Sequence, residues 1–515
     1  MLFNSYEFLF FFFPLTCAGF FALCAGGSAR AAAAWLALMS VLFYGYWSPR
    51  YIALLLVSIA ANFLVGQLLL RCHPGASRFK GAHVLTVAVA GNLTALAYFK
   101  YANFFVDSLR VATGFDLQIA NVVLPIGVSF FTFTQIAFLV DTYQGKVREA
   151  RFLHYLLFVT YFPHLIAGPV LHHSEMMPQF GRAQTYRFQL DNVVSGITLL
   201  VIGLVKKVIF ADGIQPFVAA AFDGDPSRTL TGFEAWGAAL AYSLQLYFDF
   251  SAYSDMAIGL SRVFNVELPL NFSSPYKSRN IVEFWRRWHM TLSRFLRDYL
   301  YVPLGGNRFG LPRRYANLML TMLLGGLWHG AGWTFVIWGA LHGIYLVINR
   351  VWQAALQAAF GRPTLGKSRW AAAAGVLLTF AAVTVAWTFF RATSLDAAMR
   401  MLAAMGGRNG WVLPIEWKAT LESAIGTSAA GIRFDDLTAF AGVRQLLWIV
   451  GLWAVAWFCP NSQEIMVRLN RCRAHDVHTR AYLGWGAFGA ASTIVCLLAI
   501  VSASQGVSEF IYFNF

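Results

Sequence analysis

The chain has 515 residues, of which 58% are hydrophobic, 16% aromatic and 12% charged. Soluble domains are typically about 45–50% apolar and about 25% charged. The composition therefore argues against a soluble globular enzyme and excludes a disordered, collagen-like or coiled-coil chain. The net charge of +15 suits the basic cytoplasmic loops of a membrane protein better than nucleic-acid binding, because the sequence contains no basic-aromatic recognition module. These features predict an all-α polytopic membrane protein.

Many stretches of the sequence are long and apolar enough to cross a bilayer. One helical crossing needs about 20 apolar residues, and counting such stretches predicts about 10–12 spans within a single domain, residues 1–515. The first stretch lacks the basic region and cleavage site of a signal peptide, so we interpret it as a retained span. The other predicted spans are 32–48, 51–70, 82–100, 121–142, 190–211, 233–262, 371–391, 443–460 and 482–503.

The basic residues predict an orientation, because Lys and Arg collect in cytoplasmic loops. The loops 213–232 and 392–442 carry acidic residues and are placed outside. The stretches 152–170 and 315–349 are then predicted to enter the membrane and return. Four basic clusters are placed in the cytoplasm: Arg71, Arg78 and Lys80; Lys146, Arg148 and Arg151; the segment 277–314; and Arg468, Arg471, Arg473 and Arg480. Lys206 and Lys207 contradict this bias, and we expect them to snorkel or to face an internal cavity.

The stretch 315–349 is predicted to be a broken membrane element. It contains no Lys, Arg, Asp or Glu, and glycines interrupt it around His329. Its length exceeds one straight span and falls short of two. At helical rise His329 lies about 21 Å from Tyr315, deep in the membrane. An imidazole there can act as a general base, or it can be a neutral histidine bonded between helices. For His342, in the same element, the structural interpretation is favoured.

The segment 277–314 is predicted to contain a cytoplasmic amphipathic helix. On a helical wheel the arginines lie opposite an apolar stripe, and His289 lies at the inward edge of that stripe. Two interpretations stay open. The arginines can anchor the helix to lipid phosphates, or the segment can receive a phosphate-bearing acyl donor or an acidic carrier protein. The candidate donor or partner residues are Trp285, Arg286, Arg287, Trp288, Arg297 and Tyr299.

Two acidic residues lie inside the predicted span 233–262. Asp249 is near its middle, where a carboxylate is costly and by default functional. It can serve in a proton relay, orient a catalytic histidine, or stabilise helix packing through a polar network. Asp255 is closer to the basic loop, so a structural ion pair is favoured there.

The predicted re-entrant stretch 152–170 and the residues that follow it carry several histidines. His172, His173 and Glu175 do not form a convincing metal site, because adjacent histidines do not share a helical face and no third ligand has a suitable spacing. No cysteine pair has the CxxC spacing either. We therefore expect no metal ion.

Five segments resemble the membrane-bound O-acyltransferase (MBOAT) family, in particular its branch that acetylates bacterial exopolysaccharides. The resemblance covers nearly the whole chain, and the last two segments are specific when found together. They are GLVKKVIFAD (203–212), YFDFSAYSDMAIGL (247–260), LPLNFSSPY (268–276), FWRRWHMTLSRFLRDYLYVPLGGNR (284–308) and LWHGAGWTFVIWGALHG (327–343).

The resemblance implies a multi-helix membrane core with a central funnel or tunnel and a catalytic pair, His329 and His289. His329 would act as a general base or as a transient acyl acceptor. The implied reaction passes acetyl groups from a cytoplasmic donor, acetyl-CoA, across the bacterial inner membrane, with no bound cofactor. The implied partners are a periplasmic SGNH-type acetyltransferase subunit and a polysaccharide synthesis and export complex.

Three alternatives are left open by the sequence. His164, in FPHLIAGP, replaces the glutamine of alginate-type members, so the polymer, alginate or cellulose, is not decided. A transporter or channel that moves an acyl donor or glycan without chemistry would need a polar path but not His329. A relative that transfers D-alanyl groups or acylates proteins would use a different donor or acceptor.

Overall fold

The computed structural model describes residues 1–71, 78–115, 121–147, 151–166, 168–225, 227–361, 368–425, 432–437 and 439–473, and isolated positions between 486 and 511. These residues group into two compact units built from separated parts of the sequence. The first comprises 1–205, 252–270 and 462–514, and the second comprises 206–251 and 271–461. The long helix α12 (Gly232–Val263) supplies residues to both.

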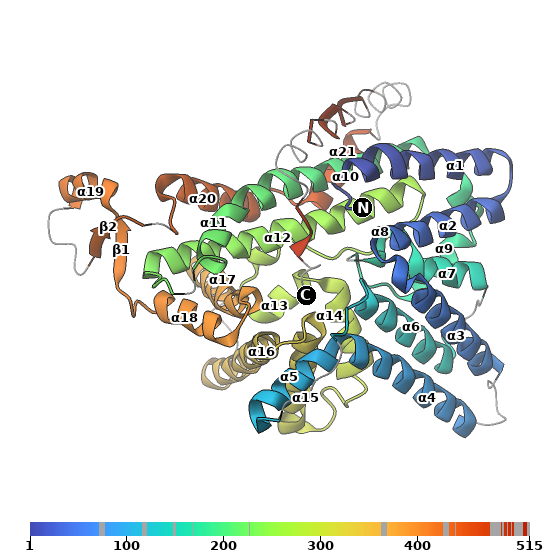
Figure 1. The fold of residues 1–515 in the computed structure, drawn as a ribbon, viewed down its shortest axis with the longest axis horizontal. Coiled ribbons are helices and arrows are strands. Elements are labelled where there is room, and N and C mark those ends of the chain that lie inside the picture. The colour runs from blue at the N-terminus through green and yellow to red at the C-terminus, as the bar shows by residue number, and fades with distance from the viewer. Residues whose placement is uncertain are drawn as a thin grey trace. The chain divides into compact units, whose positions relative to one another are not determined.

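The first unit is helical throughout its described part. In it α1 packs against α2, α2 against α7, and α6 against both α3 and α4 (Figure 1). Phenylalanine rings fill the space near the N-terminus, where Phe8, Phe12, Phe43 and Phe162 contact one another. Its helices are η1 (Glu7–Phe12), α1 (Phe13–Ala25), α2 (Ala29–Trp47), η2 (Pro49–Tyr51), α3 (Ile52–Arg71), α4 (Arg78–Leu96), η3 (Ala97–Tyr101), α5 (Ala102–Thr113), α6 (Val128–Tyr143), α7 (Phe152–Thr160), α8 (Phe162–Leu165), α9 (His173–Phe180), η4 (Ala183–Tyr186), α10 (Leu190–Leu204) and α21 (Ser462–Arg473).

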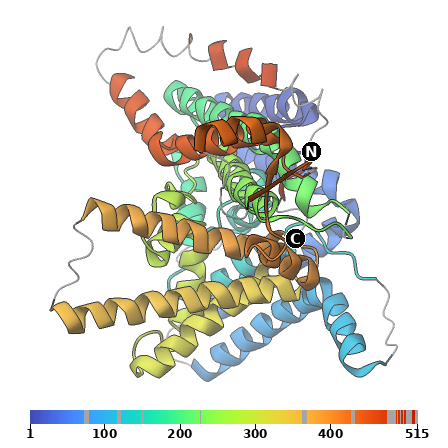
Figure 2. The same cartoon turned by 90° about the vertical axis from the view of Figure 1, so that its left-hand side faces the viewer.

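The second unit is organised around a helical hairpin. Its arms α15 and α16 pack against each other, and α16 lies beside α17, the orange helix next to it in Figure 2. A two-stranded parallel sheet, β1 (Trp411–Pro414) with β2 (Ile432–Asp435), adjoins the helices. The helices are η5 (Val205–Ala211), α11 (Asp212–Phe222), η6 (Pro275–Lys277), α13 (Ile281–Arg287), α14 (Met290–Leu296), η7 (Arg297–Tyr301), α15 (Gly310–His329), α16 (Trp333–Phe360), α17 (Arg369–Arg391), α18 (Leu395–Met405), η9 (Ile415–Trp417), α19 (Lys418–Ile425) and α20 (Gly442–Phe458).

The structure confirms an all-α polytopic membrane protein. Among the described residues seven helices are long and apolar enough to cross a membrane, and the bent pair α20 and α21 would make eight. This number is below the predicted range of about 10–12. One reason is that α6, with 16 residues, is shorter than a full span. The predicted span 482–503 lies largely outside the described residues.

Two of the predicted segments have a different local structure. The segment 277–314 does not contain one continuous amphipathic helix, because the backbone breaks at Trp288 and His289 between α13 and α14. The stretch 315–349 is not short of two helices, because α15 begins at Gly310 and α16 continues to Phe360. The predicted stretch was bounded by its lack of charged residues, but the two helices continue past it on both sides and include charged residues such as Arg313 and Arg350.

Glycines allow the two arms of the hairpin to approach closely. A Cβ atom on Gly339 would lie 2.3 Å from the Met322 carbonyl oxygen, and one on Gly326 would lie 2.3 Å from the Phe335 carbonyl oxygen. Backbone atoms cannot move aside as a flexible side chain can. Close packing of α15 against α16 therefore explains why glycine occupies positions 326 and 339.

The Gly339→Ala variant is expected to lose about 1–3 kcal/mol of stability through overpacking. Gly343→Ala is a matched control on the same helix, because its Cβ would first meet the flexible side chain of Met319. Thermal unfolding of the purified variants measures both. An equal loss for the two variants would contradict a backbone clash at Gly339.

Candidate functional site

His329 is the last residue of α15, where the hairpin turns. Its side chain is 4% exposed and lies among aromatic rings. The ring centroid is 5.0 Å from those of Trp328 and Trp338 and 5.3 Å from that of Phe390. The imidazole is therefore held in a closed aromatic environment at the end of a helix.

His289 lies at the junction of α13 and α14 with a left-handed backbone, φ 42° and ψ 53°. A non-glycine residue in this region is strained and is held there by its surroundings. The side chain is fully buried, and the ring packs edge-on against Phe250 at 4.8 Å. The break in the helix, which the helical wheel did not predict, therefore turns His289 into the interior of the second unit.

The structure brings His289 and His329 together. Their ring centroids are 6.3 Å apart, which is close enough for one reacting group to contact both rings. The two residues come from different helices and are separated by forty positions in the sequence. Hence the pair that the family resemblance implied is also a pair in space.

Asn271 holds the ring of His289, and sequence reasoning did not single it out. The His289 Nδ1 atom is 3.0 Å from Asn271 Oδ1, which also accepts a hydrogen bond of 2.9 Å from the Thr291 hydroxyl. Because Oδ1 accepts, Nδ1 carries the proton in the neutral imidazole and Nε2 carries the lone pair. The only sequence signal for Asn271 was its place in the block LPLNFSSPY.

Burial lowers the pKa of His289 from 6.5 to about 3. The folded protein therefore binds fewer protons than the unfolded chain between these values, and its stability should fall as the pH drops below about 6.5. Replacing His289 with Gln, whose amide can still donate to Asn271, removes this contribution. We expect the thermal unfolding temperature of the variant to depend less steeply on pH between 6.5 and 4 than that of the wild type. An unchanged slope would contradict the assignment.

The predicted donor residues do not all lie in one place. Trp285 and Trp288 face inward, with Trp285 5.9 Å from Trp338 and Trp288 5.0 Å from Trp387 between ring centroids. Tyr299 packs against Phe295. The arginines are outward: Arg286 and Arg297 are exposed, and Arg287 pairs with Glu283 at 2.7 Å. The structure thus confirms that this segment has a buried face and a basic face. Of the predicted donor residues, only the two tryptophans pack against the rings of Trp338 and Trp387.

Asp249 and Lys207 form a buried ion pair, which accounts for the presence of each charge in the interior. Lys207 Nζ is 2.8 Å from Asp249 and 3.0 Å from Asp212, and both Lys207 and Asp249 are almost completely buried. Lys207, one of the two lysines that contradicted the charge bias, thus faces the interior, where it pairs with the buried acid. Asp255, six residues further along α12, is 5% exposed and belongs to the first unit.

His342 packs as an aromatic ring. It is fully buried, and among the described residues neither ring nitrogen has a hydrogen-bond partner. Its centroid lies 4.7 Å from Trp338 and 5.2 Å from Trp285. Trp338 also contacts His329, so this ring packs against both histidines of the hairpin, which the sequence did not predict.

The histidines of the first unit make local contacts. His173 Nδ1 is 3.1 Å from Asp141, and the backbone N–H of His172 donates to the Glu175 carboxylate at 3.3 Å, as part of a helix cap. His164 Nε2 is 3.0 Å from the Phe158 carbonyl oxygen. In the described part of the chain no three metal-ligating side chains gather in one place.

A polytopic helical protein with two buried, neighbouring histidines in these sequence blocks is what the resemblance to integral membrane acyltransferases implies. The model of the MBOAT, membrane-bound O-acyltransferase, family matches residues 85–390. The chain therefore belongs to this family, and it is an O-acyltransferase.

Several relatives cover most of the chain. A peptidoglycan O-acetyltransferase from Helicobacter pylori is 42% identical, over 80% of this chain and 80% of its own. A protein from Azotobacter vinelandii described as probable alginate O-acetylase AlgI is 44% identical, over 82% and 81%. The corresponding Pseudomonas aeruginosa protein is 37% identical over the full length of both chains.

Proposed function

We propose that this protein transfers acetyl groups from a cytoplasmic donor, acetyl-CoA, across the bacterial inner membrane for O-acetylation of an exopolysaccharide such as alginate or cellulose. The observation that carries the proposal is the buried pair of His329 and His289, 6.3 Å apart between ring centroids. The alginate O-acetylase names of several relatives support acetyl as the group and a polysaccharide as the acceptor. Membership of an acyltransferase family argues against a transporter that performs no chemistry.

His329 is the proposed catalytic residue, and His289 assists it. As a general base, His329 would take the proton of the attacking hydroxyl while the thioester C–S bond breaks and the new C–O bond forms, and the proton would end on the CoA sulfur. As a nucleophile, its nitrogen would first form a bond to the acetyl carbon while the thioester C–S bond breaks and CoA leaves as the thiol, with the imidazole proton on its sulfur; the acetyl group would then pass to the acceptor hydroxyl, whose proton returns to the imidazole. Both roles need a neutral imidazole. Asp249 and Asp255 are the two candidates for proton relay or orientation: Asp255 stays proposed for that role, whereas the ion pair with Lys207 favours the structural alternative for Asp249.

The donor is proposed to approach the basic segment that contains Trp285, Arg286, Arg287, Trp288, Arg297 and Tyr299. The exposed guanidinium group of Arg286 suits the phosphates of CoA, whereas that of Arg297 already pairs with Asp298 at 2.7 Å and would have to exchange this partner. The proposed partners are a periplasmic SGNH-type acetyltransferase subunit, which would esterify the polymer, and the polysaccharide synthesis and export complex.

The experiment that tests the proposal uses the purified full-length protein in nanodiscs with acetyl-CoA labelled in its acetyl group. We expect thioester cleavage and transfer of label to polysaccharide when the periplasmic partner is supplied. D-alanyl carrier protein and palmitoyl-CoA are the comparison donors. Preferential use of either would overturn acetyl transfer, and absence of any donor cleavage by folded protein with its partner would overturn the enzyme mechanism.

Peptidoglycan is a second candidate acceptor, because the Helicobacter pylori relative is named a peptidoglycan O-acetyltransferase and is 42% identical. The same labelled reaction distinguishes the acceptors when alginate, cellulose and peptidoglycan are supplied separately. Label in peptidoglycan alone would replace the exopolysaccharide in the proposal.

A further inference from the structure

A cavity of about 500 Å³ lies in the second unit, and neither His289 nor His329 is among its lining residues. It is lined by residues of two segments, 220–230 and 392–409. Both segments belong to loops that the charge distribution predicts to lie outside the cytoplasm. The cavity has the size of a small-molecule site, for which about 300–1,000 Å³ is typical.

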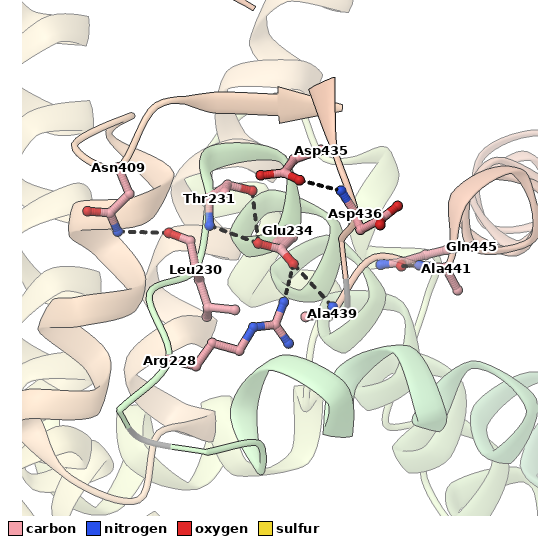
Figure 3. Close-up of polar contacts among 10 residues, drawn as sticks. All are labelled: Arg228, Leu230, Thr231, Glu234, Asn409, Asp435, Asp436, Ala439, Ala441 and Gln445. Atoms are coloured by element: carbon pink, nitrogen blue, oxygen red, sulfur yellow. Dashed lines mark hydrogen bonds and ion pairs between the residues drawn. The ribbon is translucent and has the colours of Figure 1, made fainter. Parts of the chain in front are cut away.

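One wall of the cavity is held by a buried carboxylate. Glu234 is 1% exposed and accepts hydrogen bonds from Arg228 Nη2 at 2.5 Å and from the backbone N–H of Ala439 at 3.1 Å (Figure 3). It also accepts from the Thr231 hydroxyl and backbone N–H, at 2.9 and 3.0 Å. Asn409 donates to the Leu230 carbonyl oxygen at 2.7 Å, so the two segments are tied together (Figure 3). The wall is therefore built in advance of any ligand.

The charges of the lining do not balance. Arg228 is neutralised by Glu234. The Asp225 carboxylate, which accepts two hydrogen bonds from Ser227, keeps one negative charge in the lining. Arg400 and Arg408 also line the cavity, and within the described residues neither makes an ion pair or a side-chain hydrogen bond. This holds even though Asp396 lies one helical turn before Arg400. Two guanidinium groups at a preformed cavity favour an anion.

We propose that this cavity binds a carboxylate-bearing sugar unit of the acceptor polysaccharide, an inference that rests on the proposed function and extends it to direct contact between the polymer and this membrane protein. Guanidinium groups bind planar carboxylates through two parallel hydrogen bonds. The serine, threonine and asparagine side chains of the lining, among them Ser394 and Asn409, suit sugar hydroxyls. A concave site favours a glycan over the acidic face of a protein, because protein partners bury broad surfaces.

The test measures equilibrium binding of a tritium-labelled mannuronate hexamer to the purified full-length protein in nanodiscs. The comparison ligand is the same hexamer with its carboxyl groups reduced to alcohols. We expect the double variant Arg400→Gln/Arg408→Gln to raise the Kd at least about tenfold, because two charge-assisted contacts are lost. The reduced hexamer should bind the wild type with a similar loss. Arg400→Lys/Arg408→Lys, which keeps the charges but not the planar fork, should fall between the two.

The matched control is Arg182→Gln/Arg369→Gln, which removes two exposed arginines outside the cavity and should leave the Kd unchanged. Thermal unfolding verifies that each variant is folded. Equal binding of the two hexamers, or binding that ignores the Arg400 and Arg408 substitutions, would overturn the proposal. Tighter Arg-dependent binding of hexaglutamate than of the hexamer would instead assign the cavity to an acidic protein segment.

Failure of this inference is separable from failure of the proposed function. The His329→Ala variant should bind the hexamer as the wild type does, because His329 does not line the cavity. If the hexamer binds in an Arg-dependent way but the protein does not use acetyl-CoA, the proposed binding site stands and the proposed acetyl transfer is overturned. If the protein transfers acetyl groups but does not bind the hexamer, the proposed function stands and the proposed binding site is overturned.

Discussion

Replacing His329 with alanine is expected to lower acetyl transfer by at least about 10²-fold, the usual contribution of a positioned general base. The residue is 4% exposed and lies at the turn of the α15–α16 hairpin, beside His289. The side chain makes its visible ring contacts with Trp328, Trp338 and Phe390, which hold it but cannot replace its chemistry. The measurement is transfer of labelled acetyl from acetyl-CoA per folded molecule.

The control for this prediction is His342→Phe in the same hairpin. His342 is buried among aromatic rings, and its ring nitrogens have no hydrogen-bond partner in the part of the chain that the structure describes. Phenylalanine should therefore preserve its packing and leave transfer within a few-fold of the wild type. Near-normal transfer by His329→Ala would remove His329 from the mechanism. A loss in both variants, with reduced protein abundance, would indicate that the hairpin is sensitive to any substitution.

Replacing Lys207 with methionine is expected to destabilise the protein by about 3–5 kcal/mol, because it leaves a buried charge without its partner. Asp249 and Asp212 would both lose the same ammonium group, which lies 2.8 Å from Asp249 and 3.0 Å from Asp212. Asp249→Asn should cost less, because Lys207 keeps its contact with Asp212. Unfolding of the purified variants on heating or in denaturant measures this order.

The same variants separate a structural from a catalytic role of Asp249. We expect Asp249→Asn to retain acetyl transfer per folded molecule, since the contact with Lys207 accounts for the burial of the carboxylate. The double variant Lys207→Met/Asp249→Asn should be less destabilised than the sum of the single ones, as for groups in contact. Loss of transfer by a stable Asp249→Asn protein would instead assign Asp249 to proton relay.

The local features of this protein followed from its sequence. Long apolar stretches predicted a polytopic helical protein because a bilayer demands about 20 apolar residues for each crossing. The prediction that Trp288, Leu292 and Phe295 face inward was correct, because the three side chains are buried. Side chains of neighbouring turns share one stripe whether or not the helix is continuous. Family motifs drew attention to His289 and His329, but they contained no distance between them.

The tertiary structure decided which polar groups meet. The backbone break that turns His289 inward depends on packing around a strained residue with φ 42°, and periodicity contains no signal for it. Asn271 reaches His289 across 18 residues of sequence, and Lys207 reaches Asp249 across 42. Hydrophobic patterns are local, whereas the pairing of a buried charge or imidazole requires its partner to be carried there by another part of the chain. For that reason the sequence alone determined the all-α polytopic membrane class and drew attention to the two histidines, and only the folded chain determined the number of long apolar helices and the partners that hold the histidines.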